Sequence, residues 1–448
     1  MTAPEPAPWT TQPVVAPFDA TVELPGSKSL TNRALILSAL ASGPCMLEGA
    51  LVADDTRHMI ENLRHLGLRV EADEPGRRVR VDAPGSPDLA VEPLELSCGN
   101  SGTTLRFLTA LLAAMGEAEF TLTGSPRMLE RPAGPLADLL NALGGDVTFT
   151  AREGYPPLRV RGRPLAGGHV EFDAGQAPSS QFLSAALMVA PYTRHETRIS
   201  LRGRPASWAY TRMTMRLMDV FGVTPEIERD PTTQAPTAVV VPRGRYVGTT
   251  YAIEPDASAA SYFLALAAIH PGSRVTVKGI GSHSLQGDAD FADVLRRMGA
   301  DVRQSADETT VTGPPQLNGI DADLSDMPDV AQTLAVAALF AVGETTLRGI
   351  HTLRVKETDR IAALQAELGK LGAETHLIGS GRDEALTITP LPRVRAGRVA
   401  TYDDHRMAMS FALAATKRRG VEIENPACAA KTFPEFFDTL ARALRGGG

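Results

Sequence analysis

The sequence predicts an α/β fold made of six copies of one βαβαββ unit. Each copy begins with a short alternating run, a turn of small or polar residues and an Ala/Leu-rich helical pattern. These runs occupy residues 21–41, 94–114, 170–190, 251–270, 321–341 and 398–417. A second helical pattern between copies ends on glycine, at Gly67, Gly144, Gly222, Gly299 and Gly372. Their spacings of 77, 78, 77 and 73 residues are too regular for chance, so the chain is predicted to be one repeat architecture.

Six units of this size predict two domains of three units each. Proline- and glycine-containing segments around residues 24–26 and 247–255 are the expected crossings. They give one domain of residues 27–252 and another of residues 18–26 plus 253–448. Residues 1–17 hold five prolines and neither lysine nor arginine, so they are expected to be a disordered lead-in rather than a signal or transit peptide.

Composition argues against several classes of protein. The net charge of −7 disfavours a nucleic-acid-binding protein, and the longest apolar stretch, near residues 330–342, is too short to span a bilayer. Cys45, Cys98 and Cys428 lie far apart with no CxxC pair, which argues against a disulfide framework or a zinc site. We therefore expect a monomeric, cytoplasmic protein with no nucleic-acid or membrane partner, no metal and no cofactor.

The turns before the predicted helices carry the charged groups. Cations stand at or close to several helix starts, namely Lys28, Arg33, Arg106, Lys356, Arg360 and Arg406. Helix N-termini attract anions because their backbone N–H groups are free and carry partial positive charge. If the two lobes face each other, these cations would converge on a strongly anionic, phosphorylated small substrate.

Two familiar explanations fit the first turns poorly. A nucleotide phosphate loop aligned on Lys28 and Ser29 needs glycine at positions 22 and 27, where Val22 and Ser27 stand. Cys98 is better explained as a small turn residue than as a nucleophile, because no histidine or aspartate accompanies it locally.

Other turns allow a structural explanation. Ser179, Ser180 and Gln181 begin a predicted helix, where serine often serves as a cap. Residues 256–258 carry no cation, so that turn is expected to be structural. His405, beside Arg406, is more typical of a buried, hydrogen-bonded histidine than of a catalyst.

Residues 354–360, with the sequence RVKETDR, combine cationic and acidic side chains in one short segment. Lys356 and Glu357 precede a helical pattern that ends at Gly372, and Arg360 falls in its first turn. Two explanations remain for Glu357: a carboxylate that stabilises the helix start, or a proton-transfer group beside two cations.

Seven motifs stand in order along the chain: LPGSKSLTNRA, GNSGTTLR, PRMLERP, SSQF, RVKETDR, DDHRMAM and AKTFP. With them the chain resembles the 5-enolpyruvylshikimate-3-phosphate synthase family from about residue 22 to residue 437. The resemblance implies a two-domain inverted barrel of βαβαββ units, three per domain, with the active site in the interdomain cleft. It also implies transfer of the enolpyruvyl group of phosphoenolpyruvate to the 5-hydroxyl of shikimate 3-phosphate, releasing phosphate without a metal.

The resemblance assigns roles by motif position. Phosphoenolpyruvate is expected to contact Lys28, Arg131, Gln181, Arg360, Arg406 and Lys431. Shikimate 3-phosphate is expected to contact Ser29, Arg33, Ser179, Ser180, Ser207, Tyr210 and Lys356. Further substrate contacts are expected from Asn100, Gly102, Asp329, Thr352 and His405. The implied catalytic groups are Asp329 as base for the 5-hydroxyl, Glu357 as proton carrier at the methylene carbon, and Lys28 as an aid to phosphate departure. Family members also bind glyphosate in place of phosphoenolpyruvate, and Gly102 would leave room for it.

Three positions depart from the family pattern. Thr352 stands where better-known bacterial members have asparagine, which weakens that substrate contact. Phe107 replaces a proline, which bears on how the helix at Gly102 sits. Trp208-Ala209 replaces a basic residue and a proline.

Two rival functions fit less well. The related transferase that acts on UDP-N-acetylglucosamine uses a cysteine in the loop corresponding to residues 124–132, and this chain has none there. A phosphate-sensing or scaffold protein built from the same repeats would not need an acid–base pair such as Asp329 and Glu357. The sequence therefore favours the enolpyruvyl transferase.

Overall fold

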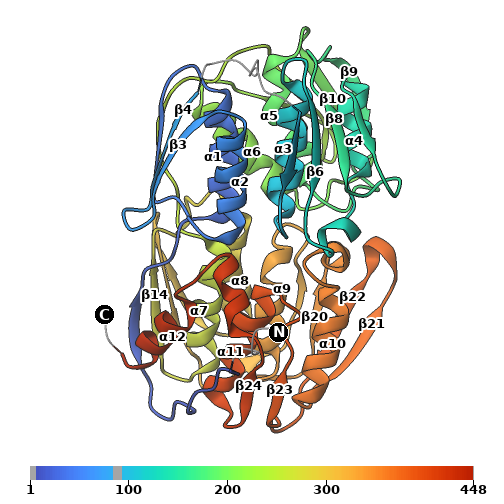
Figure 1. Cartoon of the computed structure of the whole chain (residues 1–448). Helices are drawn as coiled ribbons and strands as arrows, with labels where there is room; N and C mark the ends of the chain where they lie inside the picture. The colour runs from blue at the N-terminus through green and yellow to red at the C-terminus, as the bar shows by residue number, and fades with distance from the viewer. Residues whose placement is uncertain (1–6, 84–92, 447–448) are drawn as a thin grey trace, which may run out of the picture. The chain divides into compact units, whose positions relative to one another are not determined.

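The structure is a computed structural model that describes residues 7–83 and 93–446. The chain forms two compact units: unit 1 contains residues 1–25 and 254–448, and unit 2 contains residues 26–253 (Figure 1). The chain passes from one unit to the other after Pro25 and again after Ile253. In the described part of the chain, no helix is both long enough and apolar enough to cross a membrane.

Within the described residues, unit 2 has three four-stranded sheets of one topology. In each sheet, an outer strand runs parallel to its neighbour and the other neighbours are antiparallel. The first sheet contains, in spatial order, β13 (Thr250–Ala252), β2 (Cys45–Glu48), β4 (Arg78–Asp82) and β3 (Arg69–Asp73). The second contains β5 (Leu94–Ser97), β6 (Glu119–Thr123), β8 (Leu158–Arg161) and β7 (Val147–Phe149). The third contains β9 (Gly168–Phe172), β10 (Thr197–Leu201), β12 (Pro236–Val241) and β11 (Glu226–Arg229).

Unit 1 repeats this arrangement in two sheets of its described residues. One contains β1 (Asp19–Val22), β14 (Arg274–Lys278), β16 (Glu308–Thr312) and β15 (Asp301–Gln304). The other contains β18 (Asp321–Asp323), β20 (Thr345–Arg348), β22 (Ala385–Thr389) and β21 (Glu374–Ile378). Two parallel pairs complete the unit: β17 (Leu317–Asn318) with β19 (Ala341–Val342), and β23 (Gly397–Val399) with β24 (Val421–Ile423).

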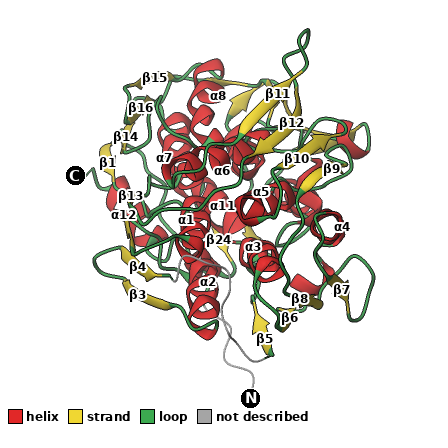
Figure 2. Cartoon of the chain, turned by 90° about the horizontal axis from the view of Figure 1, so that it is seen from above, coloured by secondary structure: helices red, strands yellow, loops and turns green. Residues whose placement is uncertain are grey.

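The first helix of each repeat is an interior helix. These helices are α1 (Lys28–Leu40), α3 (Gly102–Ala114) and α5 (Gln181–Val189) in unit 2, and α7 (Ala257–Ile269), α9 (Ala331–Ala338) and α11 (His405–Lys417) in unit 1. Every residue of α3 and α7 is buried, as expected for mainly apolar helices inside a domain, although α3 also buries Arg106 and three threonines. Figure 2 shows α1, α3, α5, α7 and α11 toward the middle of the view, with most of the labelled strands farther out. The core of each unit therefore lies between its interior helices and its sheets.

The second helix of each repeat is amphipathic and lies outside the first. These helices are α2 (Asp54–His65), α4 (Gly134–Ala142), α6 (Trp208–Val220), α8 (Phe291–Arg297), α10 (Arg360–Lys370) and α12 (Phe436–Leu444). The glycines that follow the first five have φ values of +84°, +94°, +96°, +103° and +99°. Glycine is favoured at this position because a left-handed residue closes the helix without a side-chain penalty.

These elements confirm the predicted α/β repeat fold. All six predicted strand–helix pairs are present, as β1–α1, β5–α3, β9–α5, β13–α7, β18–α9 and β23–α11. The first strands of the first and fourth copies are exchanged, since β1 pairs with β14 and β13 pairs with β2.

The expected disorder of residues 1–17 is wrong for the described part of that segment, and residues 1–6 lie outside the described residues. Trp9 forms an antiparallel bridge with Ile423, with N–O distances of 2.8 and 2.9 Å. Its ring also packs 4.8 Å from that of Phe437, centroid to centroid. Proline content suggested disorder, but one large aromatic side chain and an unpaired strand edge are enough to hold the segment. The segment thereby extends the short β23–β24 pair of the sixth repeat.

Candidate active site

In unit 1, the starts of the three interior helices are joined through one arginine. Arg406, the second residue of α11, places Nη2 2.7 Å from Oδ2 of Asp329 and 3.3 Å from Oγ of Ser258. Its Nη1 lies 3.1 Å from the Asp329 carbonyl oxygen. Ser258 is in the first turn of α7, and Asp329 lies in the 3-10 turn Pro328–Val330 that leads into α9. Within this unit, the starts of α7, α9 and α11 therefore meet at Arg406.

Asp329 is surrounded by cations. Besides Arg406, its Oδ1 lies 3.3 Å from Nη1 of Arg360 and 3.5 Å from Nζ of Lys356. The carboxylate is 14% exposed, so a small molecule could still reach it. A partly accessible carboxylate among three cations suits a group that accepts a proton beside an anionic substrate.

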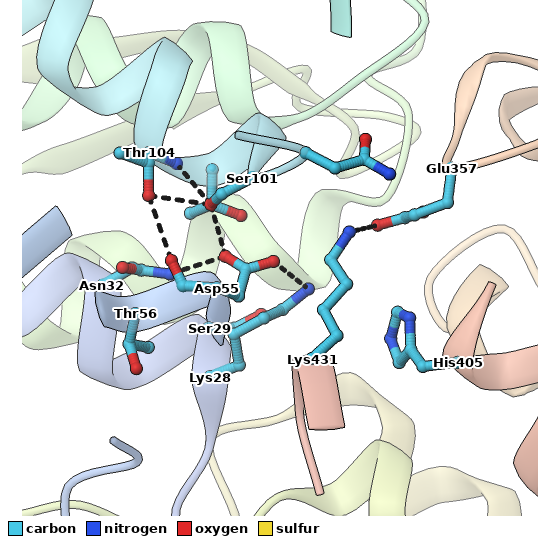
Figure 3. A network of polar contacts seen from close by, with 12 residues as sticks. Lys28, Ser29, Asn32, Asp55, Thr56, Ser101, Thr104, Glu357, His405 and Lys431 are labelled. Atoms are coloured by element: carbon cyan, nitrogen blue, oxygen red, sulfur yellow. Dashed lines mark hydrogen bonds and ion pairs between the residues drawn. The ribbon is translucent and has the colours of Figure 1, made fainter. Parts of the chain in front are cut away.

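Glu357 bridges two further cations. Its Oε1 lies 2.8 Å from Nζ of Lys431, as Figure 3 shows, and its Oε2 lies 2.9 Å from Nη2 of Arg360. The cap of α10 is Asp359, whose Oδ1 accepts hydrogen bonds from the N–H groups of Ile361 and Ala362, each at 3.1 Å. The hydrogen-bonding cap of α10 is therefore Asp359 and not Glu357.

Arg360 is the most enclosed of these cations, with 1% of its side chain exposed. Its Nε donates to Oδ2 of Asp404 at 2.7 Å. Burial opposes the charge, but Asp404, Glu357 and Asp329 together outweigh it and raise the pKa of Arg360. Asp404 also caps α11 by accepting from the N–H of Arg406 at 2.9 Å. One guanidinium therefore ties three carboxylates into a fixed network.

The loop before α11 is strained. Tyr402 and Asp403 have φ values of +55° and +54°, in the left-handed region that non-glycine residues rarely adopt. Such strain persists where surrounding structure enforces it, and it gathers at functional sites. This loop leads directly into Asp404, His405 and Arg406. His405 is buried at the first position of α11.

In unit 2, Lys28 belongs to a second network, centred on Asp55 (Figure 3). Nζ of Lys28 lies 3.7 Å from Oδ2 of Asp55, and Nδ2 of Asn32 lies 3.3 Å from Oδ1. The Ser101 hydroxyl donates to the same Oδ1 and accepts from the N–H of Thr104 at 3.2 Å. Asp55 is 2% exposed. The starts of α1, α2 and α3 are thus linked, and Lys28 has a fixed carboxylate beside it.

Arg33 is held inside unit 2. Its Nε donates to Oγ1 of Thr214 at 2.6 Å and its Nη1 to the Ser29 carbonyl at 2.9 Å. Its guanidinium lies 5.1 Å from the centre of the Phe107 ring, which gives this departure from the family pattern a cation–π role. Burial lowers the pKa of Arg33 to about 10.

Gly102 lies against Arg131. A Cβ added at Gly102 would stand 2.7 Å from Nη2 and 2.8 Å from Cζ of Arg131, closer than any real contact. Nη1 of Arg131 donates to the Asn100 carbonyl at 3.3 Å. Nearby, the Gln181 amide accepts from Nη1 of Arg106 at 2.6 Å. The absence of a side chain at Gly102 therefore leaves the space that the Arg131 guanidinium occupies.

The serine turns are only partly explained by capping. Ser179 accepts from the N–H of Gln181 at 3.2 Å, whereas Ser180 makes no side-chain cap bond although it precedes α5. Ser207, before α6, also makes none, and its φ of +49° is left-handed. The Tyr210 backbone carbonyl lies 3.5 Å from Nη2 of Arg33. Strain at a buried serine is consistent with a functional constraint.

Two further positions bear on the site. The Thr352 side chain is 2% exposed, and its hydroxyl has no hydrogen-bond partner among the described residues, so it retains donor and acceptor capacity for a ligand. Cys98 is buried and burial raises its pKa, which fits a structural thiol. In residues 7–83 and 93–446, no group of three His, Cys, Asp or Glu side chains is arranged to hold a metal ion.

Comparison with known proteins identifies the family. The model of the EPSP synthase family, described as 3-phosphoshikimate 1-carboxyvinyltransferase, matches residues 14–440. This chain belongs to the EPSP synthase family. A 3-phosphoshikimate 1-carboxyvinyltransferase of Aliivibrio salmonicida is 45% identical over 96% of this chain and 98% of that protein. A protein of the same name from Escherichia coli is 46% identical over 98% of this chain and 99% of its own length.

Solved structures agree with the EPSP synthase family. An EPSP synthase from Acinetobacter baumannii has a TM-score of 0.77 at 25% identity and covers 97% of each chain. The enolpyruvyl transferase NikO from Streptomyces tendae shares the fold, with a TM-score of 0.74 at 19% identity over 97% of this chain and 96% of its own.

Sequence reasoning missed several members of both networks. The turn at residues 256–258, expected to be structural, contributes Ser258 to the contacts of Arg406, although Asp256 does cap α7. Asp55 and Ser101 were not expected beside Lys28, and Asp404 was not expected to bind Arg360. The only sequence signal for them was their position near helix starts.

Proposed function

We propose that this chain binds phosphoenolpyruvate and shikimate 3-phosphate through the residues described above and uses Asp329 and Glu357 for proton transfer. As a member of its family, it is an enolpyruvyl transferase of the shikimate pathway, a 3-phosphoshikimate 1-carboxyvinyltransferase. The observation that carries these roles is the contact of one buried guanidinium, Arg360, with both carboxylates, at 3.3 and 2.9 Å. A shared rigid cation holds the proposed base and acid at a fixed separation, as concerted proton transfer requires.

Binding follows from charge. Phosphoenolpyruvate carries a carboxylate and a phosphate, which suit the planar guanidinium donors of Arg131, Arg360 and Arg406 and the point charges of Lys28 and Lys431. Gln181 adds a neutral donor close to the phosphate.

Shikimate 3-phosphate offers a phosphate, a carboxylate and hydroxyls. We assign its phosphate and hydroxyls to the serine turns and its remaining polar groups to cations and uncharged donors. The contributing residues are Ser29, Arg33, Asn100, Ser179, Ser180, Ser207, Tyr210, Thr352, Lys356 and His405.

The proposed chemistry is an addition followed by an elimination. The 5-hydroxyl oxygen adds to C2 of phosphoenolpyruvate, Asp329 takes the hydroxyl proton, and Glu357 delivers a proton to C3. Lys431, 2.8 Å from Glu357, is a proton donor within hydrogen-bond distance of it. Glu357 then removes a proton from the new methyl group as the C2–O bond to phosphate breaks, which re-forms the C2–C3 double bond as an enol ether. The proton taken by Asp329 passes through solvent to the departing phosphate, which leaves as hydrogen phosphate. Lys28 stabilises the charge that develops on the departing phosphate.

An acceptor assay tests the substrates directly. Phosphate release from phosphoenolpyruvate is measured with shikimate 3-phosphate and, as the control acceptor, with UDP-N-acetylglucosamine. Release with the first and none with the second is expected. Release only with the nucleotide sugar would contradict the proposal.

We further propose that the protein acts as a monomer in the cytoplasm. The three cysteines are free thiols in the described structure, which suits a reducing compartment. Light scattering coupled to gel filtration, at enzyme concentrations used for assay, should give the mass of one chain. A dimer mass would contradict the monomer.

A further inference from the structure

Asp288 lies outside every residue set assigned above, yet it is connected to Arg406. It sits in the 3-10 turn Gly287–Asp290 before α8 and is 3% exposed. Its Oδ2 accepts a hydrogen bond from the Ser258 hydroxyl. The Ser258 oxygen in turn accepts from Nη2 of Arg406 at 3.3 Å. A directed chain of donors therefore runs from the guanidinium through one hydroxyl to the buried carboxylate.

The turn that carries Asp288 is fixed to the start of α7. Gln286 donates from Nε2 to the Pro255 carbonyl at 2.7 Å, and its Oε1 accepts from the N–H of Ala257 at 3.1 Å. Glu254 accepts from the Ser284 hydroxyl at 2.7 Å. These bonds join the segments that directly precede Ser258 and Asp288, which limits how far either partner of that contact can move without breaking them.

A buried carboxylate in this place is unfavourable for stability alone. Burial, the charge of Asp329 and, to a smaller extent, the charge of Asp256 raise the pKa of Asp288. Arg406 and the Ser258 hydrogen bond oppose this rise. A neutral side chain of similar size would avoid this penalty. The carboxylate is therefore better explained by what it does to Arg406 than by its effect on folding.

We infer that Asp288 is a positioning residue that acts through Ser258 to hold the Arg406 guanidinium in line with Asp329. This inference rests on the proposed function, in which Arg406 binds phosphoenolpyruvate. Nη2 of Arg406 contacts the Asp329 carboxylate at 2.7 Å and also the Ser258 hydroxyl, which donates to Asp288. Nη1 contacts the Asp329 carbonyl at 3.1 Å and the Tyr262 hydroxyl at 3.4 Å. Without the Ser258 contact, Nη2 would lose a hydrogen-bond acceptor that is fixed on α7, and the guanidinium would be less well oriented toward Asp329 when the substrate arrives.

Steady-state kinetics of four variants test the inference. Asp288→Asn removes the charge at constant size, Ser258→Ala removes the relay, and the double variant removes both. Ser261→Ala is the matched control, because Ser261 is a buried serine one turn further along α7 that contacts the Ser258 carbonyl at 2.7 Å and Thr333 at 3.0 Å.

We expect KM for phosphoenolpyruvate to rise about 10-fold in Asp288→Asn and in Ser258→Ala, with KM for shikimate 3-phosphate nearly unchanged. The double variant should resemble either single variant, since both changes break one chain. Ser261→Ala should leave both constants at the wild-type values. Equal rises in both KM values, additive effects, or a Ser258→Ala protein that behaves like Ser261→Ala would overturn the inference.

A structural measurement separates this inference from the proposed function. If the wild-type protein releases no phosphate with these substrates, the proposed function fails. A crystal structure of Ser258→Ala then tests the positioning role of Asp288 independently of activity. The Arg406 guanidinium should leave its present position, and an unmoved guanidinium would refute the positioning role. Because Ser258→Ala removes only one hydroxyl, this test remains valid if Asp288→Asn does not fold.

Discussion

Nζ of Lys431 lies 2.8 Å from Oε1 of Glu357, although 74 positions separate the two residues in the chain. The other carboxylate oxygen of Glu357 contacts the Arg360 side chain, and Asp359 caps α10. The two acidic residues of the RVKETDR segment thus have different tasks, and each can be changed separately.

Glu357→Gln keeps the size and polarity of the side chain but removes its titratable proton. Turnover should fall by roughly 10²–10⁴-fold, the usual effect of losing a positioned acid or base. Calorimetry should show that shikimate 3-phosphate still binds. Asp359→Ala is the control: loss of the cap should cost about 1 kcal/mol of unfolding free energy and change turnover little. Near-normal turnover of Glu357→Gln would remove the catalytic assignment.

Gly102→Ala should act through Arg131. The new Cβ would stand 2.7 Å from Nη2 of Arg131, and the end of this flexible side chain can shift, so the fold should survive. Because Arg131 is assigned to the phosphoenolpyruvate site, we expect weaker inhibition by glyphosate, with a smaller loss of turnover. Inhibition constants and kcat are measured on the same preparation. Equal inhibition of variant and parent would show that Arg131 does not place the inhibitor.

Trp9→Ala should destabilise the protein without changing its kinetics. The ring packs against Phe437, and the Trp9 backbone pairs with Ile423 at the edge of β24. Loss of a half-buried aromatic side chain should cost about 1–2 kcal/mol, below the value for a fully buried one. Urea denaturation measures this difference, and assays at saturating substrate check that kcat is retained. Unchanged stability would show that the N-terminal segment is not held by this ring.

The repeat pattern allowed more of the fold than of the site to be predicted. Turn glycines such as Gly144 and the alternating runs recur at fixed intervals, and each reports local backbone geometry. The cations at helix starts were also visible, because helix periodicity locates those starts. Two other members of the unit 1 network were not visible, since Asp404 reaches Arg360 from a distant segment and Asp288 is linked to Arg406 through Ser258. The sequence therefore indicated the cations and, through the family resemblance, the carboxylates Asp329 and Glu357, whereas Asp404 and Asp288 became visible only in the structure.

The acid sensitivity of unit 1 should depend on His270. This residue ends α7, is 4% exposed, and places Nε2 2.9 Å from Oγ1 of Thr416. Burial, aided by the charge of Lys417, lowers the pKa of His270 from 6.5 to about 3. Between these two values the unfolded chain binds a proton that the folded protein does not. The stabilisation is therefore fully present above about pH 6.5 and is lost as the pH falls toward 3.

His270→Gln keeps a polar group near Thr416 but cannot be protonated. At pH 7 the variant should be less stable than the parent, because its packing against Phe18 is altered. Between pH 7 and pH 5 the parent should lose about 2 kcal/mol more than the variant, since 1.5 pH units below the unfolded-state pKa corresponds to that free energy. Urea denaturation of both proteins at the two pH values gives the comparison, and other acid-sensitive groups cancel in the difference. A stability gap that stays constant between pH 7 and pH 5 would show that His270 takes up its proton equally well in the folded and the unfolded protein.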